Sequence, residues 1–108
     1  MVIGAHVSAA GGIEKAVSRA VEMGAEAMQV FPSSPRAWAF KAPTAQTVAA
    51  FKKAATEAKL GPTVFHAVYL VALGAPDEGL VAKSVESLIN YLKTADRLGA
   101  AGVVFHPA

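Results

Sequence analysis

The sequence lacks cysteine and has few charged residues. Without a single cysteine among its 108 residues, the chain cannot form disulfides, thiolate metal sites or thiol nucleophiles. Only 17% of the residues are charged and 54% are hydrophobic, whereas an average soluble domain carries roughly 25% charged residues. This composition excludes intrinsic disorder and predicts an unusually apolar core. The absence of cysteine is compatible with a cytoplasmic location.

Long apolar runs are also missing. The mean hydropathy is +0.40, yet charges, glycines and prolines interrupt every apolar stretch before it reaches the ~18 residues of a membrane span. The opening run from Val2 to Val7 has neither a basic region nor a cleavage site of small residues, so we expect no secretory signal and no membrane partner. The net charge of +2 neither requires nor excludes a nucleic-acid partner.

Short apolar runs alternate with helical patterns along the whole chain. The predicted strands are residues 2–7, 26–31, 62–66 and 102–106. The first helix follows Gly12 and ends at Gly24. The second begins at Thr44, a suitable N-cap, and ends at Gly61; the third is capped by Asp77 and ends at Gly99. Strict alternation predicts parallel strands covered by helices.

The apolar positions of each helix predict its buried face. These positions are Ile13, Ala16, Val17, Ala20 and Val21 in the first helix, Val48, Phe51, Ala55 and Ala58 in the second, and Val81, Val85, Leu88, Leu92 and Ala95 in the third.

A weak internal repeat favours a barrel over a doubly wound sheet, although the latter stays open. Val-Phe-His occurs at 64–66 and at 104–106, and Gly-Ala precedes both the second and the fourth strand. A complete (β/α)₈ barrel needs about 250 residues. We therefore predict that residues 1–108 form one domain, the N-terminal half of a (β/α)₈ TIM-type barrel with four parallel strands and three helices.

All three histidines follow predicted strands. His6, His66 and His106 lie at the carboxyl ends of the first, third and fourth strands, and these ends meet at the face where barrel enzymes carry their active sites. Grouped imidazoles suit zinc or a similar divalent ion. We expect His66 and His106 to be metal ligands and His6 to lie on the same face. No acidic residue follows a strand, so carboxylate ligands are missing.

The loop after the second strand, residues 32–41, mixes cations with aromatic rings. Arg36 and Lys41 alternate with Trp38 and Phe40, a combination that suits phosphate contact and base stacking. The alternative is that both rings fold back as an apolar plug while Arg36 is solvated. Tyr69, three residues after His66, could stack on a substrate or simply pack.

Several motifs resemble the endonuclease IV family of apurinic/apyrimidinic endonucleases. The opening Ile3-Gly4-Ala5-His6-Val7-Ser8-Ala9-Ala10-Gly11-Gly12 is the most specific of them, followed by Phe31 to Trp38, by His66-Ala67-Val68-Tyr69-Leu70 and by Phe105-His106-Pro107. The resemblance implies a zinc-dependent phosphodiesterase that flips an abasic site out of double-stranded DNA and cuts on its 5′ side.

The same resemblance implies roles for single residues. His66 and His106 match zinc ligands of a trinuclear cluster, whereas His6 matches a nearby histidine that is not a ligand. Arg36 and Trp38 match a loop inserted at the lesion, and Tyr69 matches a second DNA-contacting loop. The sequence departs from the family at Pro32 to Pro35, at Ala72, where an asparagine is common, and at Ala108, where the family continues with Gly-Ser-His.

Two alternative functions remain. A sugar isomerase or epimerase of the related xylose-isomerase-like barrels would share the strand-end metal ligands, but it would need a closed pocket rather than an exposed loop. A non-catalytic half-barrel would serve as an assembly module. Because a half barrel exposes two strand edges and an inner face, we expect this chain to form a homodimer that restores eight strands, and to be inactive alone.

Overall fold

Strands and helices alternate along residues 1–107, the part of the chain that the computed structural model describes. The elements in order are β1 (Gly4–His6), α1 (Glu14–Glu22), β2 (Ala27–Val30), α2 (Ala45–Glu57), β3 (Thr63–His66), α3 (Glu78–Leu98) and β4 (Gly102–Val104). Their number, type and order are as predicted, although all four strands are shorter than the predicted ranges that contain them.

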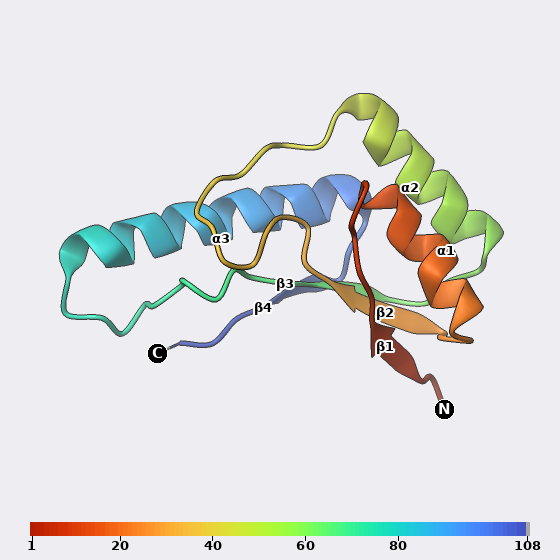
Figure 1. Cartoon of the computed structure of the whole chain (residues 1–108), viewed down its shortest axis with the longest axis horizontal. Helices are drawn as coiled ribbons and strands as arrows, with labels where there is room; N and C mark the ends of the chain where they lie inside the picture. Colours follow the sequence, from red (N-terminus) through yellow and green to blue (C-terminus); the bar gives the residue numbers. More distant parts are fainter. Residues whose placement is uncertain (108) are drawn as a thin grey trace.

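The four strands form one parallel sheet in the order β1-β2-β3-β4. His6 lies beside Gln29 on β2, and His66 lies beside Val104 on β4. Figure 1 shows the three helices on one side of this sheet, with both strand edges open. The other face of the sheet has no helical cover.

The main core lies between the sheet and the helices. Met28 and Val30 of β2 and Phe65 of β3 pack against Val17 of α1 and Phe51 of α2. A second cluster joins Ala67, Val68 and Val71 of the loop after β3 to Tyr91 of α3. Val103 packs against both clusters, so the two are continuous.

Local signals at the helix ends are mostly confirmed. The Thr44 hydroxyl accepts a hydrogen bond from the Thr47 amide at 3.1 Å, and Asp77 accepts from the Gly79 amide at 2.8 Å. Gly99 takes the left-handed conformation directly after α3, with φ 75°. The predicted end of the second helix is wrong, because α2 ends at Glu57 and the non-glycine residue Lys59 takes the left-handed turn, with φ 53°.

The predicted inward face of the third helix is wrong. Val85 is 44% exposed and Leu92 is 54% exposed. The helix instead buries a neighbouring face, which comprises Ser84, Ser87, Tyr91, Thr94, Ala95 and Leu98. Of the predicted stripe only Ala95 is buried; Val21 of α1 and Ala58 after α2, both also predicted to be buried, are exposed.

Two of the buried hydroxyls of α3 are satisfied within the helix. The Ser84 hydroxyl donates to the Leu80 carbonyl, and the Thr94 hydroxyl donates to the Asn90 carbonyl, each at 2.8 Å. A hydroxyl with such a partner is buried at little cost. No helix within residues 1–107 is both long and apolar enough to cross a membrane.

Candidate metal and nucleic-acid site

The sheet brings the three predicted histidines together at the carboxyl ends of its strands. His66 and His106 are neighbours, with ring centroids 5.1 Å apart. Phe31, directly after β2, separates them from His6, and its ring lies 4.9 Å from His6 and 4.9 Å from His66. The structure therefore gives a pair of histidines and a third that stands apart. Phe31 was not predicted, since its role depends on which rings the fold places beside it.

His66 is held in the form that a metal ligand needs. Its side chain is buried, and Nδ1 donates to the Ala67 carbonyl oxygen at 2.7 Å. Since Nδ1 carries the proton, Nε2 of the neutral ring keeps a free lone pair. A hydrogen bond from the second ring nitrogen to a carbonyl is the usual support of a metal-bound histidine.

The separation of the two rings also suits a shared ion. Two imidazoles that bind one zinc ion through nitrogens at about 2.0–2.1 Å, near the tetrahedral angle, have centroids about 5 Å apart. The pair His66 and His106 meets this condition. Among residues 1–107, however, no group of three or more histidine, cysteine or acidic side chains could hold a metal. The donor set within these residues is thus two imidazoles with no carboxylate.

His6 is exposed and differently bonded. The Gln29 amide nitrogen donates to its Nδ1 at 3.0 Å, which leaves the proton of the neutral ring on Nε2. A protonated Nε2 is a hydrogen-bond donor and not a metal ligand. His6 thus lies near the same strand ends as the pair, with its Nδ1 lone pair already engaged by Gln29.

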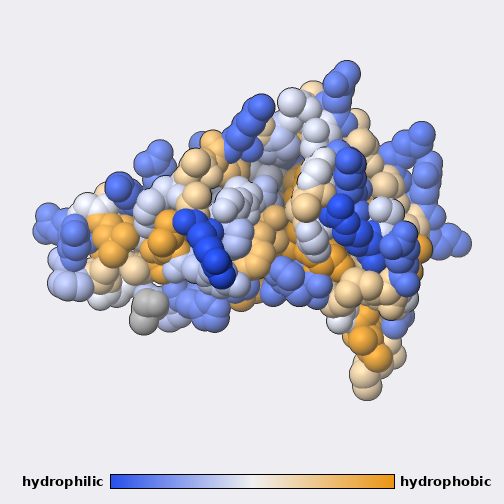
Figure 2. All heavy atoms as spheres, in the orientation of Figure 1, coloured by the Kyte–Doolittle hydropathy of each residue, from blue (hydrophilic) through white to orange (hydrophobic). Residues whose placement is uncertain are grey.

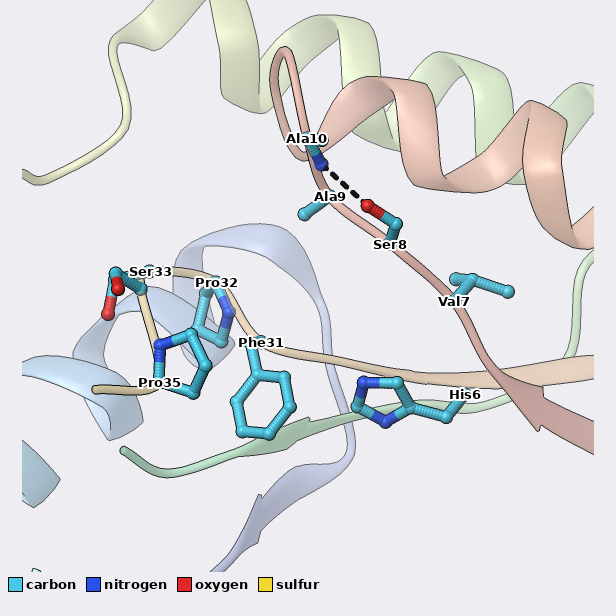
Figure 3. A pocket seen from close by; sticks show the side chains of 10 residues that line it. His6, Val7, Ser8, Ala9, Ala10, Phe31, Pro32, Ser33 and Pro35 are labelled. Atoms are coloured by element: carbon cyan, nitrogen blue, oxygen red, sulfur yellow. Dashed lines mark hydrogen bonds between the residues drawn. The ribbon is translucent and has the colours of Figure 1, made fainter. Parts of the chain in front are cut away.

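A hollow next to His6 opens between the loops after β1 and β2 (Figure 3). It has a volume of about 490 Å³. Its wall includes Phe31, Ser8, Ser33 and Pro35, and the Ser8 hydroxyl accepts a hydrogen bond from the Ala10 amide at 3.1 Å. Ser8 is thereby engaged with its own turn.

The loop between β2 and α2 exposes its two cations and partly buries its two aromatic rings. Arg36 is exposed, whereas Trp38 and Phe40 are partly buried against the cluster around Tyr91. Phe40 lies 5.9 Å from the Tyr91 ring, and the Ser33 hydroxyl is hydrogen-bonded to the Tyr91 hydroxyl. The rings thus form the apolar plug that the sequence left as an alternative. Neither Ser33 nor Tyr91 was singled out from the sequence.

Tyr69 links this loop to the histidine pair. Its side chain is 57% exposed, and its ring lies 5.9 Å from His66 and 5.3 Å from Phe31. Its amide donates to the Pro35 carbonyl at 2.7 Å. The two loops predicted to contact DNA are therefore joined through their main chains.

A parallel sheet with helices on one face and imidazoles at the strand ends defines a partial β/α barrel. Residues 17–108 match the family model described as xylose isomerase-like TIM barrel, and the chain belongs to this family. The resemblance to endonuclease IV is confirmed in sequence and in fold. The chain is 41% identical to the probable endonuclease 4 of Nitratidesulfovibrio vulgaris and 42% identical to that of Aquifex aeolicus.

Solved structures give the same result. The crystal structure of endonuclease IV from Thermus thermophilus matches 97% of this chain with a TM-score of 0.90 and 44% identity. A 3-keto-D-glucoside 4-epimerase from E. coli matches 95% with a TM-score of 0.65 and 18% identity, which shows the fold alone. The matches cover 98% of this chain but only 37% of both curated relatives, and 39% of the Thermus structure. The chain thus spans little more than a third of their length.

Proposed function

We propose that this chain is part of a zinc-dependent endonuclease that recognises abasic sites in double-stranded DNA and cleaves the phosphodiester on the 5′ side of the lesion. The pair His66 and His106 carries the proposal, because its rings lie 5.1 Å apart and Nδ1 of the buried member donates to a carbonyl, which leaves the lone pair of the neutral ring on Nε2. The likeness to proteins named probable endonuclease 4 supports it. We further propose that residues 1–108 act as one half-barrel domain in the cytoplasm.

The residues divide into a metal side and a DNA side. His66 and His106 would hold one zinc ion. When bound, zinc would stabilise charge on a phosphate oxygen and activate a water molecule. Arg36 is exposed and offers a cation to the phosphates, and the exposed ring of Tyr69 offers a stacking surface beside the histidine pair. Trp38 supports the loop from beneath, since it is partly buried.

The chain alone is expected to be inactive. The trinuclear cluster of the resembled family needs carboxylate ligands, and the described residues 1–107 bring none beside the histidine pair. Two imidazoles leave most of the zinc shell to water, so the affinity for zinc is expected to be weak.

Competition with a chromophoric chelator tests the metal side. His66→Ala and His106→Ala should each lower the zinc affinity at least about tenfold, whereas the matched variant His6→Ala should keep it. Unchanged affinity in either of the first two variants contradicts the paired site. Cleavage of abasic DNA by this chain with excess zinc, abolished by His66→Ala, would show that the site is more complete than proposed.

We also propose that two copies pair through their open edges. Within residues 1–107, β1 pairs only with β2 and β4 only with β3. Figure 2 shows apolar atoms at the surface over α3 and at the N-terminal tip. Ile89 is 45% exposed and Ile3 is 63% exposed. A closed dimer would restore eight strands and cover both edges.

Light scattering at low micromolar concentration tests the dimer. Ile89→Glu places a charge in the exposed apolar surface of α3, the helix that packs against the edge strand β4, and should give monomers. Ala49→Glu, at an exposed position on α2, which connects the two inner strands β2 and β3, should leave the dimer intact. A monodisperse wild-type monomer that binds no dye specific for exposed apolar surface would contradict the pairing.

A further inference from the structure

The long loop between β2 and α2 is attached to the rest of the molecule at a few points. The Pro35 carbonyl accepts the hydrogen bond from the Tyr69 amide at 2.7 Å. Ser33 is hydrogen-bonded to the Tyr91 hydroxyl, and Phe40 packs against the Tyr91 ring. Two of these attachments, one polar and one apolar, therefore end on the same side chain of α3.

Tyr91 is itself rigidly placed. Its side chain is only 1% exposed, and it lies in one cluster with Ala67, Val68 and Val71. Burial raises the pKa of the Tyr91 hydroxyl above 10.0, and the hydrogen bond to Ser33 acts in the opposite direction. The hydroxyl is thus neutral at physiological pH and remains available for this bond.

We propose that Tyr91 is a positioning residue for the loop that carries Arg36. Its hydroxyl holds Ser33 at one end of the loop and its ring holds Phe40 at the other. Arg36 lies between these two anchors and is turned outward, next to the carbonyl that binds the Tyr69 amide. This role rests on the proposed DNA contact of the loop, but the attachment itself can be measured without DNA.

The attachment predicts that loss of one hydroxyl loosens the loop. Tyr91→Phe keeps the ring and removes the bond to Ser33, and Ser33→Ala removes the other partner from the loop side. A single hydrogen bond contributes enough to change the closed-to-open ratio by about 3- to 10-fold. The double variant should equal either single variant, because both lose the same bond.

Two measurements report on the loop directly. Trp38 is the only tryptophan of the 108 residues, so its emission and its quenching by acrylamide report the packing of this loop alone. Trypsin cleaves after Arg36 and Lys41, and cleavage requires a loosened loop. Both Tyr91→Phe and Ser33→Ala should speed this cleavage about 3- to 10-fold.

Ser34→Ala is the matched control. Ser34 is exposed in the same loop, and its side chain makes no hydrogen bond within the described residues. If Tyr91→Phe and Ser33→Ala both behave like Ser34→Ala in trypsin cleavage and in Trp38 quenching, the positioning role is overturned. A urea midpoint for each variant checks that the fold is retained. If Tyr91→Phe fails to fold, Ser33→Ala still tests the attachment, because it changes only a loop residue.

DNA binding separates this inference from the proposed function. Tyr91→Phe should weaken binding of a duplex with a tetrahydrofuran abasic analogue in proportion to its loosening of the loop. If Arg36→Ala leaves that binding unchanged while Tyr91→Phe still loosens the loop, the proposed DNA contact fails and Tyr91 stands as the anchor of the loop. If the loop does not loosen, the anchor fails whatever the DNA result.

Discussion

A methyl group at Gly61 would collide with the main chain just before β2. An ideal Cβ at this position lies 2.7 Å from the Glu26 carbonyl oxygen, and the Gly61 amide donates to the same oxygen at 2.6 Å. Gly102, at the start of β4, offers a matched position, because a Cβ there meets nothing within 4 Å. Both substitutions thus add one methyl group at the start of a strand. The methyl group of Gly61→Ala has a close neighbour, and that of Gly102→Ala has none.

The size of the effect follows from these contacts. An ordinary Cβ contact begins at 3.4 Å and the contact here is 2.7 Å, so the turn before β3 must move by about 0.7 Å and weaken the bond to Glu26. Loss of that bond costs about 1 kcal/mol, and local strain adds about 1–2 kcal/mol. The lower entropy of the unfolded chain offsets about 0.4–1 kcal/mol. We expect Gly61→Ala to lower the free energy of unfolding by about 1–2 kcal/mol.

Thermal unfolding followed by far-UV circular dichroism measures this difference. At about 4–8 °C per kcal/mol for a small domain, Gly61→Ala should lower Tm by roughly 5–15 °C. Gly102→Ala should leave Tm unchanged or slightly raised. Protein concentration must be held fixed, because association shifts Tm. Equal Tm values for the two variants would refute the steric argument.

Three further predictions concern single side chains. Since the folded pKa of Tyr91 is raised above its unfolded value of 10.0, stability should be full below about pH 10 and fall as the pH rises further, and Tyr91→Phe should show a smaller fall in urea midpoint. Arg36→Ala should reduce the slope of log K against log salt concentration for DNA binding by about 1, the value for one lost phosphate contact. Lys53→Ala on α2 should leave this slope unchanged. Asp77→Ala should cost about 1 kcal/mol in denaturant titrations, because it removes the cap of α3.

Local chemistry made the helix ends predictable. Thr44 and Asp77 cap their helices through bonds that span two or three residues, and Gly99 takes a conformation that glycine adopts freely. The end of α2 was not predictable in this way, because the turn falls on Lys59 and not on the nearby glycine. A lysine in this conformation carries no sequence signal.

The face of α3 shows where hydropathy misleads. The pattern predicts that the stripe through Val85 and Leu92 is buried, yet the buried face of α3 includes Ser84, Tyr91 and Thr94. Small side chains and hydroxyls that bond within the helix permit close packing on the sheet. A hydropathy pattern contains no information about whether a hydroxyl has a hydrogen-bond partner. It therefore predicts that the more apolar of the two adjacent faces, the one with Val85 and Leu92, is buried.

The candidate site was predictable in its position and not in its contacts. Parallel strands place His6, His66 and His106 at the same end of the sheet, and the element order alone indicated this arrangement. The bond between Ser33 and Tyr91 joins residues 58 positions apart. Such a contact depends on the packing of α3 against the loop, which the sequence pattern had assigned to the wrong face. One error about the helix therefore concealed the anchor of the loop.

The exposed apolar stripe of α3 could stabilise the chain if another surface covered it. Three large apolar side chains on α3, namely Val85, Ile89 and Leu92, are each roughly half exposed. Fully burying such a side chain contributes about 1.5–3 kcal/mol, so completing the burial of all three offers about 2–5 kcal/mol to any surface that covers them. This is of the same order as the stability of a small domain. The outer face of α3 is therefore a surface whose covering would stabilise the fold itself, and association and folding of this chain are expected to be coupled.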